Sequence, residues 1–319
     1  MLAFLCMPIQ YVDRSTHRIL TEEVYGHFAL SLLYGDGLFS RIFGFFLLPL
    51  LARFQWFSLL YGYLQKRPKS KDNIAPFIAQ YKIDASEFAK ADFDSFNDFF
   101  TRKLKPSSRS VIEDPSRACL PADGRYLAYS AIDTSLPFLI KGQPFLLEAF
   151  LHNRVYARRF ERGAMVIARL APVDYHRFHF PFDGVPSKPK AIDGALYSVN
   201  PIALARRLSI LWHNKRVITE IESEAFGTVL FVEVGATCVG TIHQTYTADT
   251  QAAKGDEKGY FSFGGSCIVL LFEKDRIELD ADLVENTKRG FETYAHFGQS
   301  LGKAKRATNR ASKQTNPQS

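Results

Sequence analysis

The sequence contains few cysteines and no long apolar run, and each shortage excludes a class of protein. The four cysteines among 319 residues are far apart and form no Cys-x-x-Cys pair. The sequence therefore indicates neither a disulfide framework nor a structural zinc site, and it favours a reducing compartment. No glycine-rich segment ends in the Gly-Lys-Ser/Thr of a phosphate-binding loop. The first residues lack the basic start and small-residue cleavage site that are typical of a secretory signal peptide.

Acidic residues are also missing from the C-terminal end, and this changes the meaning of the net charge. The formal net charge is +7 at pH 7, which by itself favours a nucleic-acid or anionic-membrane partner. Residues 302–319 carry no acid and supply five of these seven positive charges. We therefore predict no nucleic-acid partner, and a basic disordered tail over 302–319.

Residues 27–63 are rich in aromatic residues and poor in charge. They include eleven aromatic residues, and their charged residues are Asp36, Arg41 and Arg53. Because these charges interrupt the stretch, no apolar run within it approaches the roughly 20 residues needed to span a bilayer. We expect helices that lie in a membrane interface, followed over 66–71 by either a linker or a basic strip that faces anionic lipid. The alternative is a buried aromatic helical hairpin.

The hydrophobic pattern changes from helical to strand-like near residue 119. Asp94 and Ser95 are suited to cap a helix over 96–104, and Asn200-Pro201 predicts one later short helix. Short β-rich runs separated by turns occur at 125–132, 164–170, 227–234 and 237–247. We predict an α+β protein, with a helical membrane-associating region at 1–105 and a mostly antiparallel β domain at 106–301.

Three groups of polar residues are candidates for chemistry. Ser266 follows two glycines and precedes the apolar run Ile268–Phe272, which predicts a turn that leads into a buried strand. Asp123 lies in a tight turn, and His176 and His179 lie three residues apart in an aromatic segment. A serine, a histidine and an aspartate together supply a nucleophile, a base and an orienting group. Two histidines without a third ligand at a suitable spacing do not predict a metal site.

Taken together, these segments resemble the phosphatidylserine decarboxylase family. The resemblance covers roughly residues 95–300, with the motifs in the family's order. The matching segments are Phe96–Leu104, Pro121–Gly124, Lys141-Gly142, Asp174–His179, Tyr197–Asn200, Asn214–Val217, Val234–Ala236, Val239-Gly240 and Lys254–Ser266. Many members of the family have Leu-Gly-Ser-Thr where this chain has Gly264-Gly265-Ser266-Cys267. The serine is kept, and the effect of Cys267 on the rate of processing is left open.

The resemblance implies that the chain cuts itself between Gly265 and Ser266. Ser266 Oγ attacks the carbonyl of Gly265, with His179 as the base and Asp123 as the group that orients the imidazole. The ester formed eliminates and hydrolyses, so that Ser266 becomes a pyruvoyl group. This covalent cofactor requires neither a metal nor pyridoxal phosphate.

The resemblance further implies a lipid substrate. The pyruvoyl carbonyl accepts electrons when phosphatidylserine loses carbon dioxide, and His176 handles the proton in forming phosphatidylethanolamine. One implied partner is phosphatidylserine in an anionic membrane. After the cut, the large chain 1–265 and the small chain 266–319 are also partners of each other. A homo-oligomer is left open. The implied location is peripheral, on the cytoplasmic side of the inner membrane.

Two other classes of protein are compatible with the residues alone. The first is a membrane-associated hydrolase that uses the same serine, histidine and aspartate without cutting itself, and it would remain a single chain. The second is a non-catalytic membrane-binding protein. The presence together of Asp123, His176, His179 and Ser266 argues against the second class.

Overall fold

The structure is a computed structural model, and it describes residues 9–23, 56–132, 139–140, 142–236, 241–264 and 266–305. Most of the aromatic stretch predicted to bind a membrane lies outside the described residues. So do Gly265 and residues 306–319 of the predicted tail. Among the residues that are described, no helix is both long enough and apolar enough to cross a membrane.

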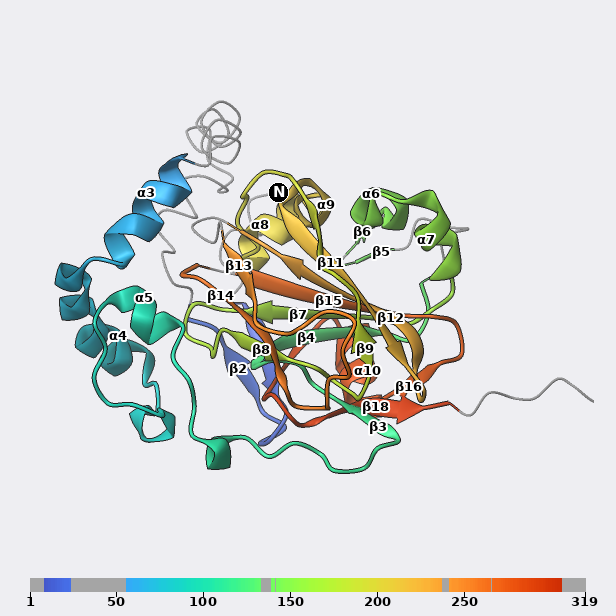
Figure 1. Cartoon of the computed structure of the whole chain (residues 1–319), viewed down its shortest axis with the longest axis horizontal. Helices are drawn as coiled ribbons and strands as arrows, with labels where there is room; N and C mark the ends of the chain where they lie inside the picture. The colour runs from blue at the N-terminus through green and yellow to red at the C-terminus, as the bar shows by residue number, and fades with distance from the viewer. Residues whose placement is uncertain are drawn as a thin grey trace, which may run out of the picture.

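The centre of the molecule is one large sheet (Figure 1). From edge to edge it contains β10 (Lys190–Ile192), β11 (Arg216–Ser223), β12 (Gly227–Val234), β15 (Ser266–Phe272), β7 (Met165–Leu170), β4 (Gly124–Tyr129), β17 (Glu292–Ala295), β1 (Gln10–Asp13) and β2 (Ile19–Thr21), with β9 (Val185–Pro186) paired to β11. Apart from the parallel pair of β1 and β17, the described strands of this sheet pair in the antiparallel sense. The mostly antiparallel β domain predicted from the sequence is thus confirmed.

Smaller sheets and short helices surround the large sheet. The smaller sheets contain β13 (Ile242–Gln244), β14 (Glu257–Phe261) and β8 (Arg177–His179); β16 (Ile277–Leu279), β18 (Ser300–Ala304) and β3 (Arg117–Cys119); and β5 (Leu139–Ile140) and β6 (Gln143–Pro144). The α-helices in the described part of the chain are α3 (Trp56–Gln65), α4 (Ile74–Tyr81), α5 (Phe96–Phe100), α6 (Leu147–Leu151), α7 (Arg154–Arg159), α8 (Pro201–Arg206), α9 (Ile210–His213) and α10 (Ala281–Lys288). The 3₁₀ helices among the described residues are η2 (Pro68–Asn73), η3 (Ala85–Glu87) and η4 (Pro106–Ser108).

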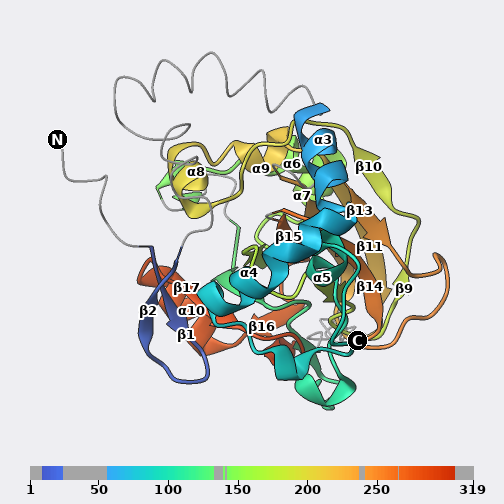
Figure 2. The same cartoon turned by 90° about the vertical axis from the view of Figure 1, so that its left-hand side faces the viewer.

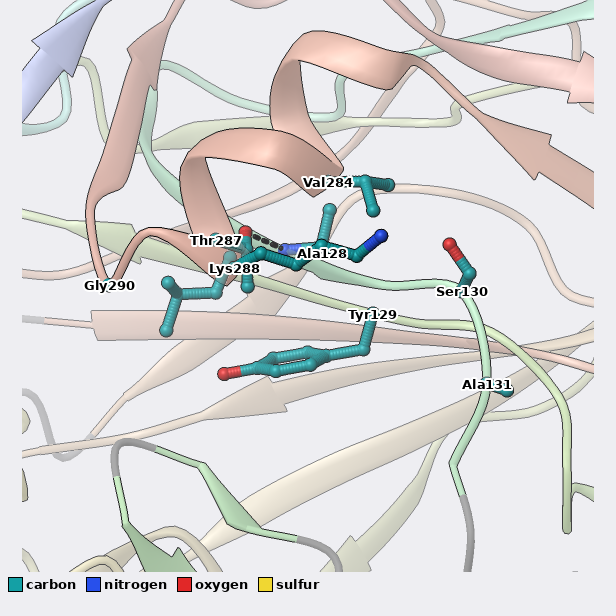
Figure 3. A pocket seen from close by; sticks show the side chains of 9 residues that line it. Ala128, Tyr129, Ser130, Ala131, Val284, Thr287, Lys288 and Gly290 are labelled. Atoms are coloured by element: carbon teal, nitrogen blue, oxygen red, sulfur yellow. Dashed lines mark hydrogen bonds between the residues drawn. The ribbon is translucent and has the colours of Figure 1, made fainter.

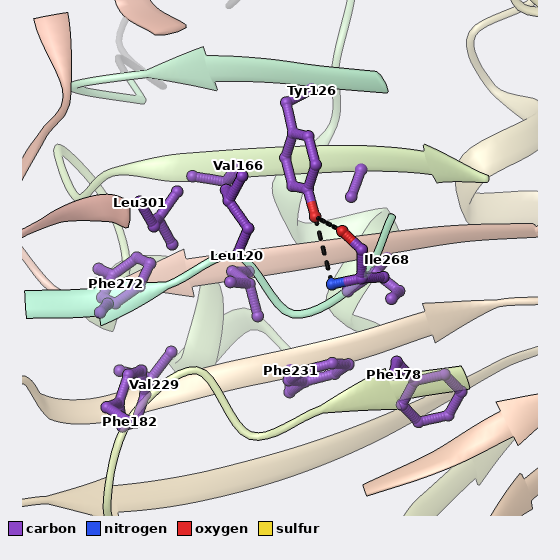
Figure 4. Packing of buried hydrophobic residues seen from close by; sticks show 14 of the residues in the cluster. Leu120, Tyr126, Val166, Phe178, Phe182, Val229, Phe231, Ile268, Phe272 and Leu301 are labelled. Carbon is purple, nitrogen blue, oxygen red and sulfur yellow. Dashed lines mark hydrogen bonds between the residues drawn. The ribbon is translucent and has the colours of Figure 1, made fainter. Parts of the chain in front are cut away.

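After Ser266, strand β15 is apolar, as expected for a strand that is buried on both faces. Successive side chains of a strand point to opposite faces, so alternate residues enter two different cores. Ile268, Leu270 and Phe272 join a core with β8 and the sheet of β16, β18 and β3 (Figure 4). Cys267, Val269 and Leu271 join a core covered by α6, α8 and α9. The apolar run predicted to be a buried strand is therefore a central strand, between β12 and β7.

A third core consists largely of phenylalanines and connects the N-terminal helices to the start of β15. Phe96, Phe99 and Phe100 of α5 pack with Phe77 of α4 and with Phe263. Their rings meet mostly edge to face, which is the favourable arrangement for aromatic pairs. Figure 2 shows α3, α4 and α5 together on one side of the molecule. These helices therefore lie against the segment that precedes Ser266.

Several boundaries differ from those predicted. Helix α5 is capped by Ser95 as predicted but ends at Phe100 rather than near residue 104. Residues 10–21, in the region predicted to be helical, form the hairpin of β1 and β2. Its pairing with β17 joins residues far apart in sequence, and local periodicity carries no signal for such a pairing. Strand β18 extends through Ala304, three residues into the segment predicted as tail, because it pairs on both sides.

Candidate active site

Ser266 is the first residue of the central strand β15 and is fully buried. It lies opposite Leu170 of β7, so the neighbouring strand fixes its backbone. Gly264 has a φ of +136°, which side-chain-bearing residues rarely adopt, so a glycine is required just before the site. The serine hydroxyl is thus held by the sheet itself, after a sharp change in chain direction.

The ring of His176 contacts the Ser266 hydroxyl. Nδ1 of the ring lies 3.4 Å from Ser266 Oγ, and Nε2 lies 2.9 Å from the carbonyl oxygen of Ala171. A carbonyl oxygen only accepts hydrogen bonds, so Nε2 must carry the ring hydrogen. Nδ1 then has a lone pair that faces the serine hydroxyl. The ring of Phe100 stacks on His176 at 3.9 Å between centroids and fixes its plane.

His176 is neutral in these surroundings. The ring is fully buried, and burial lowers its pKa to about 3. Burial is the largest cause of this lowering, the nearby positive charge of Arg102 adds to it, and the hydrogen bond to Ala171 opposes it. His176 is therefore a good hydrogen-bond acceptor for Ser266 but a weak base.

The ring of His179 has the opposite tautomer and a different set of neighbours. Its Nδ1 lies 2.9 Å from the carbonyl oxygen of Gly255, so Nδ1 carries the hydrogen and Nε2 has the lone pair. The hydroxyl of Tyr175 lies 3.4 Å from Nε2. Burial lowers the pKa of His179, but the Gly255 carbonyl and the carboxylates of Glu257 and Asp123 oppose this shift. Its surroundings therefore favour a proton more than those of His176.

Asp123 is held in its turn by an arginine and a backbone amide. Arg109 donates to both carboxylate oxygens, at 2.6 to 3.1 Å, and the N–H of Phe297 donates to Oδ1 at 2.8 Å. The Tyr126 hydroxyl bonds to the backbone of Ala122 and fixes the turn (Figure 4). The ring of Phe297 stacks on His179 at 3.8 Å. Phe297 thus links the aspartate to this histidine, and no direct hydrogen bond joins them among the described residues.

The structure therefore brings Ser266 and His176 into contact and places Asp123 and His179 in a second, adjoining assembly. The division of roles predicted for the two histidines stays a prediction. Sequence reasoning did not single out Arg102, which is 4% exposed and donates to the carbonyls of Val173 and Asp174. Burial lowers its pKa to about 10. Its place in a helical motif gave no signal that its guanidinium would reach the histidine segment.

No group of His, Cys, Asp and Glu that could hold a metal occurs in the part of the chain that the structure describes. A cavity of about 530 Å³ lies elsewhere, where β4 meets α10 (Figure 3). Its walls include Tyr129, Ser130, Thr287 and Lys288, with Thr287 bonded to the backbone of Ala128. It contains none of the predicted site residues.

The fold and the site define a protein in which a sheet-held serine faces a neutral histidine, as in sites that use serine as a nucleophile. Residues 96–303 match the sequence profile of the phosphatidylserine decarboxylase family. The chain is 42% identical to the phosphatidylserine decarboxylase proenzyme of Chlamydia pneumoniae, over 93% of this chain and 98% of the relative. The proenzyme of Chlamydia trachomatis serovar L2 is 45% identical (92% and 96%), and that of Fusobacterium nucleatum is 41% identical (93% and 98%). The chain belongs to the phosphatidylserine decarboxylase family.

Proposed function

We propose that the chain is made as a proenzyme, cuts itself at Ser266, and decarboxylates phosphatidylserine to phosphatidylethanolamine. The observation that carries this proposal is the buried Ser266 hydroxyl facing the lone pair of a neutral histidine, in a chain of this family. The relatives named above are proenzymes, which fits a chain that is processed before it acts. The pyruvoyl group made from Ser266 supplies a carbonyl that accepts the electrons released with carbon dioxide.

The cut needs a proton to leave Ser266 Oγ as this oxygen attacks the carbonyl of Gly265. The Ser266 nitrogen then becomes an amine and an ester joins Oγ to Gly265. Elimination releases Gly265 as a carboxylate and leaves a double bond in residue 266. Addition of water and loss of ammonia then give the ketone. Each step uses atoms of the chain and water, so no oxidant or metal is required.

We assign the roles of the two histidines from two properties of each ring: its contact with Ser266 and its capacity to hold a proton. His176 lies next to Ser266 but has a pKa of about 3, so a full proton on its ring is unfavourable near neutral pH. The carboxylates around His179 favour its charged form. We assign to His176 the orientation of the Ser266 hydroxyl and, after the cut, the proton at the site of decarboxylation. The anionic substrate would raise its pKa. His179, supported by Asp123, is the base for the cut.

Cleavage would not separate the two chains. The small chain, residues 266–319, contains β15, which lies between β12 and β7 of the large chain. It also contains β17, which pairs with β1 and β4. Hydrogen bonds on both sides of these strands, together with the two cores that β15 joins, hold the small chain in the sheet. The active protein is therefore a complex of both chains.

The helix α3 supports peripheral binding to a membrane close to the site. Leu60, Tyr63 and Leu64 are 45 to 56% exposed, and basic residues follow at 66–71. The ring of Tyr61 on the same helix contacts Phe263, three residues before Ser266, at 5.6 Å between centroids. Apolar and basic groups of this kind favour an anionic lipid surface. We propose that this face lies on the membrane and that phosphatidylserine enters the site from it.

A gel of the purified protein separates this function from a serine hydrolase that stays whole. We expect the unmutated protein to give a large and a small chain, and Ser266→Ala to give one chain of 36.1 kDa without decarboxylase activity. The matched control is Ser262→Ala, because Ser262 also bonds to a histidine, His243, at 3.0 Å. This control should be cut normally. A full-length, active, unmutated chain would rule out self-processing and favour the hydrolase.

A further inference from the structure

A buried ion pair that the proposed reaction does not use holds the segment before His176. Asp174 pairs with Arg125 of β4, and the two side chains are 2% and 6% exposed. Arg125 Nη1 donates to Asp174 Oδ2 at 2.5 Å, and the backbone N–H of Ala171 donates to the same oxygen at 2.6 Å. A single carboxylate oxygen therefore fixes the backbone N–H of Ala171, and with it the start of the turn, relative to β4.

The carbonyl of Ala171 determines the tautomer of His176. Its oxygen accepts from His176 Nε2 at 2.9 Å and from the backbone N–H of Asp174 at 2.9 Å, which closes a turn. Pro172 is the second residue of this turn, where its fixed φ is favourable. If the carbonyl pointed elsewhere, the ring hydrogen could move to Nδ1 and face the oxygen of Ser266 as a donor. The hydroxyl would then lose its acceptor.

The ion pair is itself anchored in the N-terminal hairpin. Glu22, directly after β2, lies 3.2 Å from Arg125 Nε and binds Arg169 of β7 through both carboxylate oxygens, at 2.5 and 3.0 Å. The rings of Tyr11 and Tyr294 lie 5.1 and 4.9 Å from the Arg125 guanidinium. Arg125 is thus restrained by side chains of two strands, β1 and β17, and by Glu22 after β2, and it offers Asp174 a fixed partner.

We propose that Asp174 and Arg125 are positioning residues for the chemistry at residue 266. They hold the Ala171 carbonyl so that His176 keeps its hydrogen on Nε2 and its lone pair toward Ser266. This inference rests on the proposed function, because it says how the same site is held in its reactive form. Both residues act through Ala171 and not on the reacting atoms.

A purely structural role predicts a different result from a positioning role. Breaking a buried ion pair destabilises a protein whatever that pair positions. A structural role would therefore reduce the rate only as far as it reduces the folded fraction. A positioning role reduces the rate of the folded protein, and it does so through His176 alone.

The test is a double-mutant cycle on the rate of self-cleavage, measured per folded protein. Asp174→Ala should slow the cut about tenfold, the effect of losing one oriented hydrogen bond, and His176→Ala should do the same. The double variant should be no slower than either single one. Asp174→Asn keeps an oxygen for Ala171 and should retain most of the rate. If the effects of Asp174→Ala and His176→Ala on the cutting rate add fully in the double variant, the proposal is overturned.

The matched control removes another carboxylate from the same buried cluster. Glu292 binds Arg169 at 2.6 Å and is as buried as Asp174, but none of its contacts among the described residues is with the turn before His176. Glu292→Ala should lower the unfolding temperature while leaving the cutting rate of the folded protein unchanged. Equal slowing by Glu292→Ala and Asp174→Ala would contradict a positioning role.

A readout that does not depend on activity separates this inference from the proposed function. In Ser266→Ala protein, ¹⁵N NMR of labelled histidine should show His176 protonated on Nε2. Adding Asp174→Ala should give a mixture of tautomers, and adding Glu292→Ala should not. An unchanged tautomer in the Asp174→Ala protein would overturn the inference. Failure of the unmutated protein to cut would instead reject the proposed function.

Discussion

His176 and His179 are three residues apart, yet their surroundings give them opposite properties. His176 is fully buried beside Arg102, and its free nitrogen faces Ser266. His179 lies among carboxylates, is bonded to a different carbonyl, and has the other tautomer. Closeness to the nucleophile and capacity to hold a proton are therefore divided between two rings. His176 lies just before β8 and His179 ends it, so the two side chains meet different neighbours, and those neighbours set the chemistry.

The largest effect should come from removing the base. General-base catalysis contributes about 10²- to 10⁴-fold, so His179→Ala should leave the chain almost entirely uncut over hours. His176→Ala should be cut slowly but detectably. The cut fractions are read from gels of protein synthesised in a time course. Equal loss of cutting in both variants would mean that the roles are not divided as proposed.

The next effect separates the two steps of the reaction. His176→Asn keeps a polar group near the position of Nδ1 that can accept from Ser266 but cannot take up a proton. We expect cutting close to the unmutated rate, together with decarboxylation slowed about 10²-fold in the cut protein. The release of carbon dioxide from labelled phosphatidylserine measures the second step. Normal decarboxylation by this variant would remove His176 from the proton transfer.

A smaller effect concerns stability at acid pH. Burial lowers the pKa of His176 from 6.5 in the unfolded chain to about 3 in the folded chain. Between these two pH values, the unfolded chain binds a proton on this ring that the folded chain does not. Stability therefore falls as the pH decreases from 6.5 toward 3, by about 2 kcal/mol at pH 5 from this residue. Urea unfolding of Ser266→Ala protein at pH 7 and pH 5 should show this loss.

Asparagine variants measure how much each histidine contributes to the loss of stability at acid pH. His176→Asn is placed in the uncut Ser266→Ala protein. It should reduce the loss of unfolding free energy between pH 7 and pH 5 by about 2 kcal/mol. His179→Asn should reduce it less, because carboxylates oppose the lowering of its pKa. A larger change from His179→Asn would show that the electrostatic contrast between the two rings is reversed.

Much of the β domain could be predicted because each strand carries its own local pattern. The run after Ser266 was predicted as a buried strand, and the strand at 227–234 has the predicted bounds. The hairpin of β1 and β2 could not be predicted, since it is held by pairing with β17 and by the contacts of Glu22 and Arg14 with distant residues. Such pairing depends on the finished fold and leaves no periodic signal in the sequence.

The candidate residues could be named from motifs, but their contacts could not. The contact of Ser266 with His176 depends on the turn at Ala171, and the link between Asp123 and His179 runs through Phe297. Neither feature follows from residue spacing. Tautomers are likewise set by whichever carbonyl the folded chain places against each ring.

The mass of the small chain tests the central proposal most directly. Denaturing mass spectrometry of the purified protein should show a chain that begins at residue 266 and ends with the sequence. Its mass should be lower than that of the same peptide with an N-terminal serine by one ammonia, and it should not react with amine reagents at its N-terminus. A small chain with an intact, reactive serine at residue 266 would contradict the pyruvoyl mechanism.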